Sequence, residues 1–226
     1  MINIGLIPAR KGSKRIKKKN LKVLGNQPLI QYSIENALSS NLDKVIISSD
    51  CDEIINFSKN FNVETIKRPM ELAGDESTTF DVVKHVVQSL NKNENIERIF
   101  LLQPTCPFRP KNLINDALNI FQETECDSVT TYRKVDFFHP NRIKKIRNGK
   151  VLNYCEEEIE NVGVSKLPPA YQRDGYLYSF RTEVLIKQNS FFGKKAKALI
   201  INENFFININ NKFDWLVAES FLNEKK

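Results

Sequence analysis

The chain has 226 residues, of which 41% are hydrophobic and 27% charged, a composition typical of a folded globular protein rather than a disordered one. Its formal net charge is +7 at pH 7. No apolar run approaches the roughly 18 residues that span a bilayer and Met1 opens no basic leader, so we expect a cytoplasmic protein without a membrane partner. The four cysteines show no Cys-x-x-Cys spacing, which argues against a disulfide framework and a metal cluster.

A loop dense in basic side chains follows the first predicted strand, which covers residues 2–8. Its cationic residues are Arg10, Lys11, Lys14, Arg15, Lys17, Lys18 and Lys19. Because like charges repel, this density is unfavourable unless an anion lies among them, and a polyphosphate is the expected one. Gly12 and Ser13 offer backbone N–H groups and a hydroxyl to phosphate oxygens, although the loop matches neither the P-loop nor Gly-x-Gly-x-x-Gly.

Charge alone leaves two other interpretations of this loop open, a solvated basic turn and a nucleic-acid patch. No helix-turn-helix, zinc-finger or RNP-like pattern accompanies the basic residues, so we expect no nucleic-acid partner.

Predicted strands and helices alternate after the basic loop. Helical periodicity covers residues 29–38, about 52–60, about 80–90 and 110–123, and short apolar strands cover residues 45–49, 63–66, 99–102 and 127–132. This alternation predicts a parallel sheet with crossover helices. Open sheets of this kind bind ligands at the carboxyl ends of their strands, where the basic loop also lies.

Two further loops follow predicted strands. Residues 67–79 end in hydroxyl side chains that can cap the next helix, and a capping role alone would explain them. Residues 103–109 contain two prolines that hold the loop extended, so it presents Gln103 and Thr105, although a stiff connector is the alternative.

The alternation breaks over residues 133–169, which we predict to be an appendage and not sheet. This stretch holds Phe137 and Phe138, the turn pair Asn148-Gly149 and an acidic run at 156–158. Exposed phenylalanines there would indicate a subunit contact, and we expect His139 to be a packed or loop histidine. Residues 167–180 return to strand, and an amphipathic helix from residue 215 closes the chain.

Several of these segments together resemble one enzyme family. Residues 7–21 resemble the signature of the N-acylneuraminate cytidylyltransferases (CMP-sialic acid synthetases), which include the CMP-pseudaminic and CMP-legionaminic acid synthetases. The Arg-Pro-x-Glu-Leu-Ala stretch from Arg68 resembles their second motif. Residues 102–109 resemble Leu-Gln-Pro-Thr-Ser-Pro-Leu-Arg, with Cys106 and Phe108 as departures.

Two later motifs match the family less closely. Around Gly175, where the family usually has Arg-x-Asn-Gly-Ala-Ile-Tyr, Gln172 replaces the arginine and Asp174 replaces the asparagine. The family's last motif is Asp-Ile-Asp-x-x-x-Asp-Trp. Here Asn208 and Asn210 replace its first two aspartates, which usually bind magnesium.

The resemblance implies an α/β fold of the nucleotide-diphospho-sugar transferase type (Rossmann-like), with a mostly parallel sheet. Residues 1–226 would form a single cytidylyltransferase domain, and residues 133–169 a protruding arm that joins two subunits in a homodimer. The implied reaction makes a CMP-activated nonulosonic (sialic-acid-like) sugar from CTP and releases pyrophosphate, for surface polysaccharide biosynthesis. A relative that uses another sugar such as 3-deoxy-manno-octulosonate, and a non-catalytic nucleotide-binding relative with a decayed metal site, are the alternatives.

The resemblance also assigns roles to single residues. Arg10, Lys14 and Lys19 would hold the phosphates, with Arg10 and Lys19 catalytic, and Asn20, Arg68, Thr79 and Gln103 would hold cytidine. Gln103, Arg173, Asp174 and Tyr178 would contact the sugar, and Asn208, Asn210 and Asp214 would hold Mg²⁺ weakly.

Overall fold

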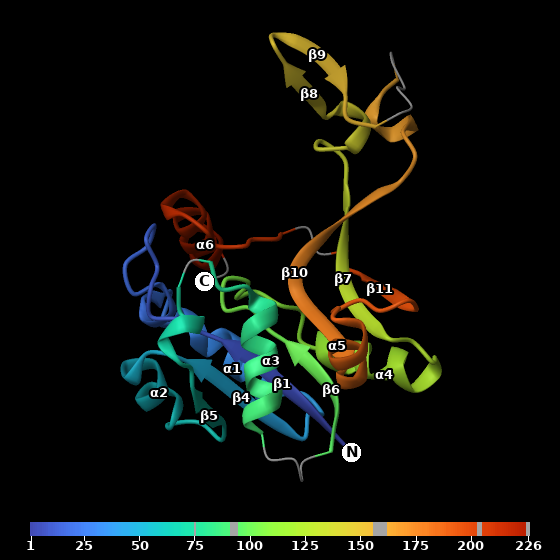
Figure 1. Ribbon diagram of the computed structural model, residues 1–226. Helices are drawn as coiled ribbons and strands as arrows, with labels where there is room; N and C mark the ends of the chain where they lie inside the picture. The colour runs from blue at the N-terminus through green and yellow to red at the C-terminus, as the bar shows by residue number, and fades with distance from the viewer. Residues whose placement is uncertain (75, 91–94, 156–161, 203–204, 225–226) are drawn as a thin grey trace.

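A seven-stranded sheet forms the centre of the computed structural model, which describes residues 1–74, 76–90, 95–155, 162–202 and 205–224 (Figure 1). Its strand order is β11-β7-β10-β6-β1-β4-β5. The strands are β1 (Ile2–Pro8), β4 (Lys44–Ser49), β5 (Glu64–Lys67), β6 (Ile96–Leu101), β7 (Ser128–Val135), β10 (Ala170–Arg181) and β11 (Ala196–Ile200). Only β10 runs antiparallel to its neighbours in this sheet, so the predicted mostly parallel sheet is confirmed.

Helices cover both faces of the sheet. The first face packs against α1 (Leu29–Leu38), α2 (Asp52–Ser58) and α4 (Leu113–Glu123), and the second against α3 (Thr79–Ser89) and α5 (Thr182–Gln188). Side chains alternate between the two layers because successive strand residues point to opposite faces. In β1, Leu6 packs in the α3 layer and Ile7 in the α1 layer, each fully buried. Burial of such a side chain contributes about 1.5–3 kcal/mol.

A smaller apolar cluster anchors the basic loop. Ile16 from that loop, Ile207 and Ile209 pack with Trp215 of α6 (Lys212–Glu224). Leu24 joins them from a short hairpin of β2 (Val23–Leu24) and β3 (Gln27–Pro28). The chain also contains the 3₁₀ turns η1 (Lys19–Leu21), η2 (Met70–Leu72), η3 (Pro140–Arg142) and η4 (Val164–Lys166). This cluster fixes the basic loop and residues 207–210 against one another.

The stretch predicted as an appendage stands away from the sheet (Figure 1). The prediction that it contains no sheet is wrong, because β7 extends into it as far as Val135 and a hairpin of β8 (Lys144–Arg147) and β9 (Lys150–Asn153) lies at its tip; β10 begins directly after it. Asn148 and Gly149 form the turn with φ of 51° and 74°, as that residue pair favours. The acidic run at 156–158 lies outside the described residues.

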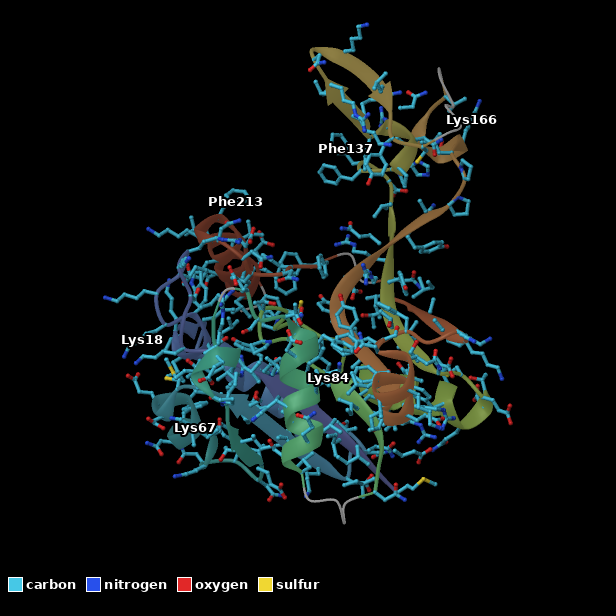
Figure 2. The ribbon with its side chains drawn as sticks, viewed as in Figure 1. Lys18, Lys67, Lys84, Phe137, Lys166 and Phe213 are labelled. Atoms are coloured by element: carbon cyan, nitrogen blue, oxygen red, sulfur yellow. The ribbon has the colours of Figure 1, made fainter. Side chains whose placement is uncertain are left out.

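Two aromatic side chains of this stretch face solvent. Phe137 and Phe138 are 76% and 73% exposed, and Figure 2 shows Phe137 pointing away from the strands. His139 is instead buried, with Nδ1 accepting from the Asn141 N–H and Nε2 donating to the Pro168 carbonyl at 2.7 Å. It is a packed histidine, as expected.

The helix over residues 29–38 has the bounds that its periodicity predicts, whereas α5 and β11 were not predicted. None of the helices in the described ranges is long and apolar enough to cross a membrane.

Candidate active site

A cavity of about 340 Å³ opens where the loops after β1, β5 and β6 meet residues 208–210. The sequence-predicted residues that line it are Arg10, Lys19, Asn20, Arg68, Thr79, Gln103, Asn208 and Asn210. Five other predicted residues do not line it, namely Lys14, Arg173, Asp174, Tyr178 and Asp214. The predicted phosphate and cytidine residues therefore meet in one place, with the exception of Lys14, which is exposed on the same loop.

Lys19 and Arg10 carry the positive charge at one end of the cavity. The Lys19 Nζ donates to the Ile209 carbonyl at 2.9 Å, and an Arg10 Nη1 donates to the Gly74 carbonyl at 3.2 Å. Burial lowers the pKa of Lys19, and the nearby Arg15 and Arg10 guanidinium groups lower it further. Asn20 donates from Nδ2 to the Arg10 carbonyl at 2.9 Å, so it fixes the loop backbone at this end.

The neighbouring lysines of the basic loop face away from the cavity. Lys18 has a left-handed backbone with φ of 50°, and its Nζ forms an ion pair with Glu53 at 2.7 Å on the outside of the loop (Figure 2). Lys17 lines a separate groove beside Trp215. Only part of the charge density that the sequence shows is therefore available to a ligand in the cavity.

The loop after β5 supplies the opposite wall. Arg68 is buried, and its guanidinium donates to the Ser48 carbonyl at 2.9 Å and to the Ser48 hydroxyl at 3.4 Å. Thr78 caps α3 by accepting from the Asp81 N–H, and the Asp81 carboxylate accepts from the Thr78 N–H. The capping role of this loop does not exclude a role in the cavity, because Thr79 begins the helix and also lines the cavity.

A buried arginine that the sequence analysis did not single out anchors the Gln103 loop. Arg109 donates to the carbonyls of Gln103 and Tyr176 at 2.5 and 2.6 Å, and to the Ser33 hydroxyl at 2.9 Å. Its place at the end of the Gln103 motif was the available signal. Gly175 has φ of +84°, a left-handed conformation that other residues adopt only with strain, and an added Cβ there would lie 3.3 Å from the Asn208 Nδ2.

Cys106 lies beneath this loop and is not suited to be a nucleophile. Burial raises the pKa of its thiol to about 11, so the thiol is protonated at neutral pH.

Of the residues predicted to contact the sugar, Gln103 lines the cavity, whereas Arg173, Asp174 and Tyr178 lie on β10 and do not line it. Asp174 is buried, and its Oδ1 accepts from the Tyr176 N–H at 2.9 Å and from the Thr131 hydroxyl. Burial raises the pKa of Asp174. The Arg173 guanidinium lies 5.1 Å from the Phe192 ring centre, and Tyr178 pairs with Leu101 of β6. Within one chain, these three side chains do not line the cavity that contains Lys19 and Arg10.

The residues predicted to hold magnesium are bonded among themselves. The Asn210 Nδ2 donates to the Asn208 Oδ1 at 3.2 Å. The Asp214 Oδ2 accepts from the N–H groups of Asn210 and Asn211 at 2.7 and 3.1 Å, which makes it a cap of α6. Among the described residues, no group of three His, Cys, Asp or Glu side chains could hold a metal ion. Magnesium prefers one or two carboxylates, so this set does not fit a protein-held ion.

Comparisons with known proteins identify the family of the chain. The N-acylneuraminate cytidylyltransferase of Escherichia coli is 28% identical over 98% of this chain, which spans about half (52%) of that relative's length. The CMP-N,N'-diacetyllegionaminic acid synthase of Legionella pneumophila is 28% identical over 97% of this chain and 95% of its own. A solved CMP:2-keto-3-deoxy-manno-octonic acid synthetase, complexed with CTP, shares the fold with a TM-score of 0.75 at 14% identity, and each chain is covered in full. The cytidylyltransferase family model matches residues 4–217, and the chain belongs to that family.

Proposed function

We propose that the chain transfers the cytidylyl group of CTP to a nonulosonic (sialic-acid-like) sugar and releases pyrophosphate. The observation that carries this proposal is the meeting of Arg10 and Lys19 with Arg68 and Gln103 around one cavity, in a chain of the cytidylyltransferase family. Relatives named for sialic and legionaminic acid substrates support the choice of sugar class. The reaction takes place in the cytoplasm and supplies activated sugar for surface polysaccharide biosynthesis.

The chemistry that these residues perform is positioning and charge neutralisation. The anomeric hydroxyl of the sugar attacks the α-phosphorus in line, a bond from its oxygen to that phosphorus forms, the bond to the pyrophosphate oxygen breaks, and the hydroxyl proton is released. Lys19 and Arg10 neutralise the charge on the phosphates and on the departing pyrophosphate. Arg68, Thr79, Asn20 and Gln103 hold cytidine so that its α-phosphate faces the open side of the cavity.

The residues at the predicted magnesium site would hold an ion only weakly. Asn208 and Asn210 bring no charge, and the Asp214 carboxylate already accepts two backbone N–H groups at the start of a helix. A magnesium ion bound together with CTP would supply charge neutralisation on the phosphates.

The protein works as a homodimer whose arms, residues 133–169, contact the other subunit. A hairpin of two strands is marginally stable alone in water, and β8 and β9 pair only with each other among the described strands. The exposed Phe137 and Phe138 offer an apolar surface that a second copy would cover. In this dimer the arm helps to close the sugar site of the partner subunit, whereas Arg173, Asp174 and Tyr178 lie on β10, outside the arm.

A pyrophosphate-release screen tests the proposal. The purified chain is combined with each of the four nucleoside triphosphates and with sialic, legionaminic and pseudaminic acids and 3-deoxy-manno-octulosonate. We expect release with CTP and one of the first three sugars. Release only with 3-deoxy-manno-octulosonate or with another nucleotide would replace the substrate assignment. CTP binding without turnover of any sugar would favour a non-catalytic nucleotide-binding protein, a candidate that the uncharged Asn208 and Asn210 support.

A further inference from the structure

Arg109 combines deep burial with neutral partners. Its side chain is 7% exposed, and burial lowers the pKa of its guanidinium. In the part of the chain that the structure describes, its hydrogen bonds all end on uncharged oxygen atoms, two carbonyls and one hydroxyl. The Asp174 carboxyl interacts with the guanidinium electrostatically and partly offsets the effect of burial on its pKa. Burying a charge without a hydrogen-bonded carboxylate is costly, so a residue of this kind is retained for what it holds in place.

The three oxygen atoms come from three separate segments. Ser33 lies in α1, Tyr176 in β10 and Gln103 in the loop after β6. A planar guanidinium donates from three nitrogen atoms in a rigid fork, whereas an ammonium group donates from a single nitrogen. Arg109 therefore ties the Gln103 loop to both the sheet and a helix of the first layer.

Two hydrogen bonds connect the same loop to Lys19. The Ile209 N–H donates to the Thr105 carbonyl at 2.8 Å, and the Ile209 carbonyl accepts from the Lys19 Nζ at 2.9 Å. Gln103 and Lys19, which both line the cavity, are thus connected through one short loop.

We propose that Arg109 is a positioning residue for two groups of the site: it holds Gln103 directly, and it holds Lys19 through Thr105 and Ile209. This inference rests on the proposed function for the roles of Gln103 and Lys19, whereas the hydrogen-bonded connection is a property of the fold. Loss of the guanidinium loosens the loop, so it weakens CTP binding and also slows turnover. Loss of a residue that only contacts the base would weaken CTP binding without slowing turnover.

The central variant is Arg109→Met, which keeps much of the side-chain volume and removes every donor. We expect kcat/KM for CTP to fall about 10²-fold, the usual loss when reacting groups are displaced by about 1 Å, with changes in both kcat and KM. The matched control is Arg181→Met. Arg181 also bonds a backbone carbonyl, that of Cys126, and it lies at the opposite end of β10 from the cavity. The control should lose stability without a comparable loss of kcat/KM.

Hydrogen exchange gives a readout that needs neither sugar nor turnover. In Arg109→Met the Ile209 amide should exchange faster while the amides of β1 keep their protection, and in Arg181→Met the Ile209 amide should stay protected. CTP affinity, measured by calorimetry, should fall only in the Arg109 variant. If the parent protein fails to turn over CTP but Ile209 still loses protection, the proposed function fails and the connection from Arg109 to Ile209 stands.

Two further experiments remain decisive if Arg109→Met does not fold. Ser33→Ala removes only the hydroxyl acceptor, and it should increase Ile209 exchange and lower CTP affinity by a smaller factor, roughly threefold to tenfold. Arg109→Ala, folded in the presence of guanidinium ions, should regain turnover with guanidinium but not with ammonium at the same ionic strength. Unchanged Ile209 exchange and CTP affinity in Ser33→Ala, with no selective rescue by guanidinium, would overturn the proposal. Equal losses in the Arg109 and Arg181 variants would do the same.

Discussion

Two adjacent lysines allow a matched test of the cavity. Lys19 lines the cavity and donates to the Ile209 carbonyl, whereas Lys18 points outward to Glu53. We expect Lys19→Ala to lower kcat strongly and to weaken CTP binding less, because charge on the departing pyrophosphate grows in the transition state. Lys18→Ala removes the same charge from the chain but leaves the cavity intact, so it should keep parental kinetics.

The expected size of the Lys19 effect follows from its position. A unit charge about 4 Å from a phosphate oxygen, at an effective dielectric constant of about 20, interacts by about 4 kcal/mol. Only the part of this interaction energy that grows toward the transition state accelerates the reaction. We therefore expect Lys19→Ala to lower kcat about 10²-fold. This loss corresponds to about 2.7 kcal/mol and matches the usual loss of one preorganised electrostatic contact.

The pH dependence offers a second signature of Lys19. Its pKa is lowered from the 10.5 of an ordinary lysine, so the ammonium loses its proton at a lower pH than a free lysine would. Because the charged form binds phosphate, kcat/KM should fall as pH rises through this lowered value. The alkaline decline should disappear in Lys19→Ala and persist in Lys18→Ala.

The assay follows pyrophosphate release at saturating sugar, and calorimetry gives the CTP dissociation constant separately. If Lys19→Ala and Lys18→Ala have equal kcat values, Lys19 does not stabilise the transition state. If both lose activity equally, the long-range charge of the loop matters and the contact geometry does not, which would also refute the reasoning.

Three other predictions concern the charge, the metal and the assembly. Arg10→Ala should raise KM and lower kcat together, since Arg10 would touch the triphosphate in ground and transition states alike; steady-state kinetics with an unchanged KM would contradict this. Asn208→Asp combined with Asn210→Asp should lower the magnesium concentration for half-maximal rate, and an unchanged magnesium titration, or full parental activity in excess chelator, would show that the account of the metal is wrong. Phe137→Ser with Phe138→Ser should shift sedimentation from dimer to monomer; a parent that is monomeric and fully active would remove the dimer proposal.

The sequence predicted the parts of the site that depend on local pattern and on strand ends. Lys19, Arg68 and Gln103 follow apolar strands, and parallel strands bring their carboxyl ends to one edge, so these residues meet in the structure as expected. The sequence pattern could not predict that the Lys18 and Lys19 side chains point in different directions. The left-handed backbone at Lys18, which turns its side chain outward, is a property of the folded loop.

Other features depend on contacts between distant positions. Arg109 acts on Ser33 and Tyr176, which lie 76 and 67 positions away, so no local spacing reveals its role. The edge strand β11 is mostly exposed and gains its conformation from pairing with β7, which explains why its own residues show no clear strand pattern. Asp214 matched a metal-binding motif, yet the same position serves as a helix cap here.

The continuity of β10 matters for the construction of chimaeric proteins. This single strand enters from the arm at Ala170, opposite Val135 of β7, passes the Gln103 loop at Gly175 and ends between β6 and β7 at Arg181, away from the cavity. An exchange of residues 136–169 with a relative would replace the arm and leave the ladder, Gly175 and the Tyr176 carbonyl in place. An exchange extended to residue 178 would also replace the backbone on which the Gln103 loop rests. Grafts meant to replace only the arm should therefore be joined at Val135 and Ala170.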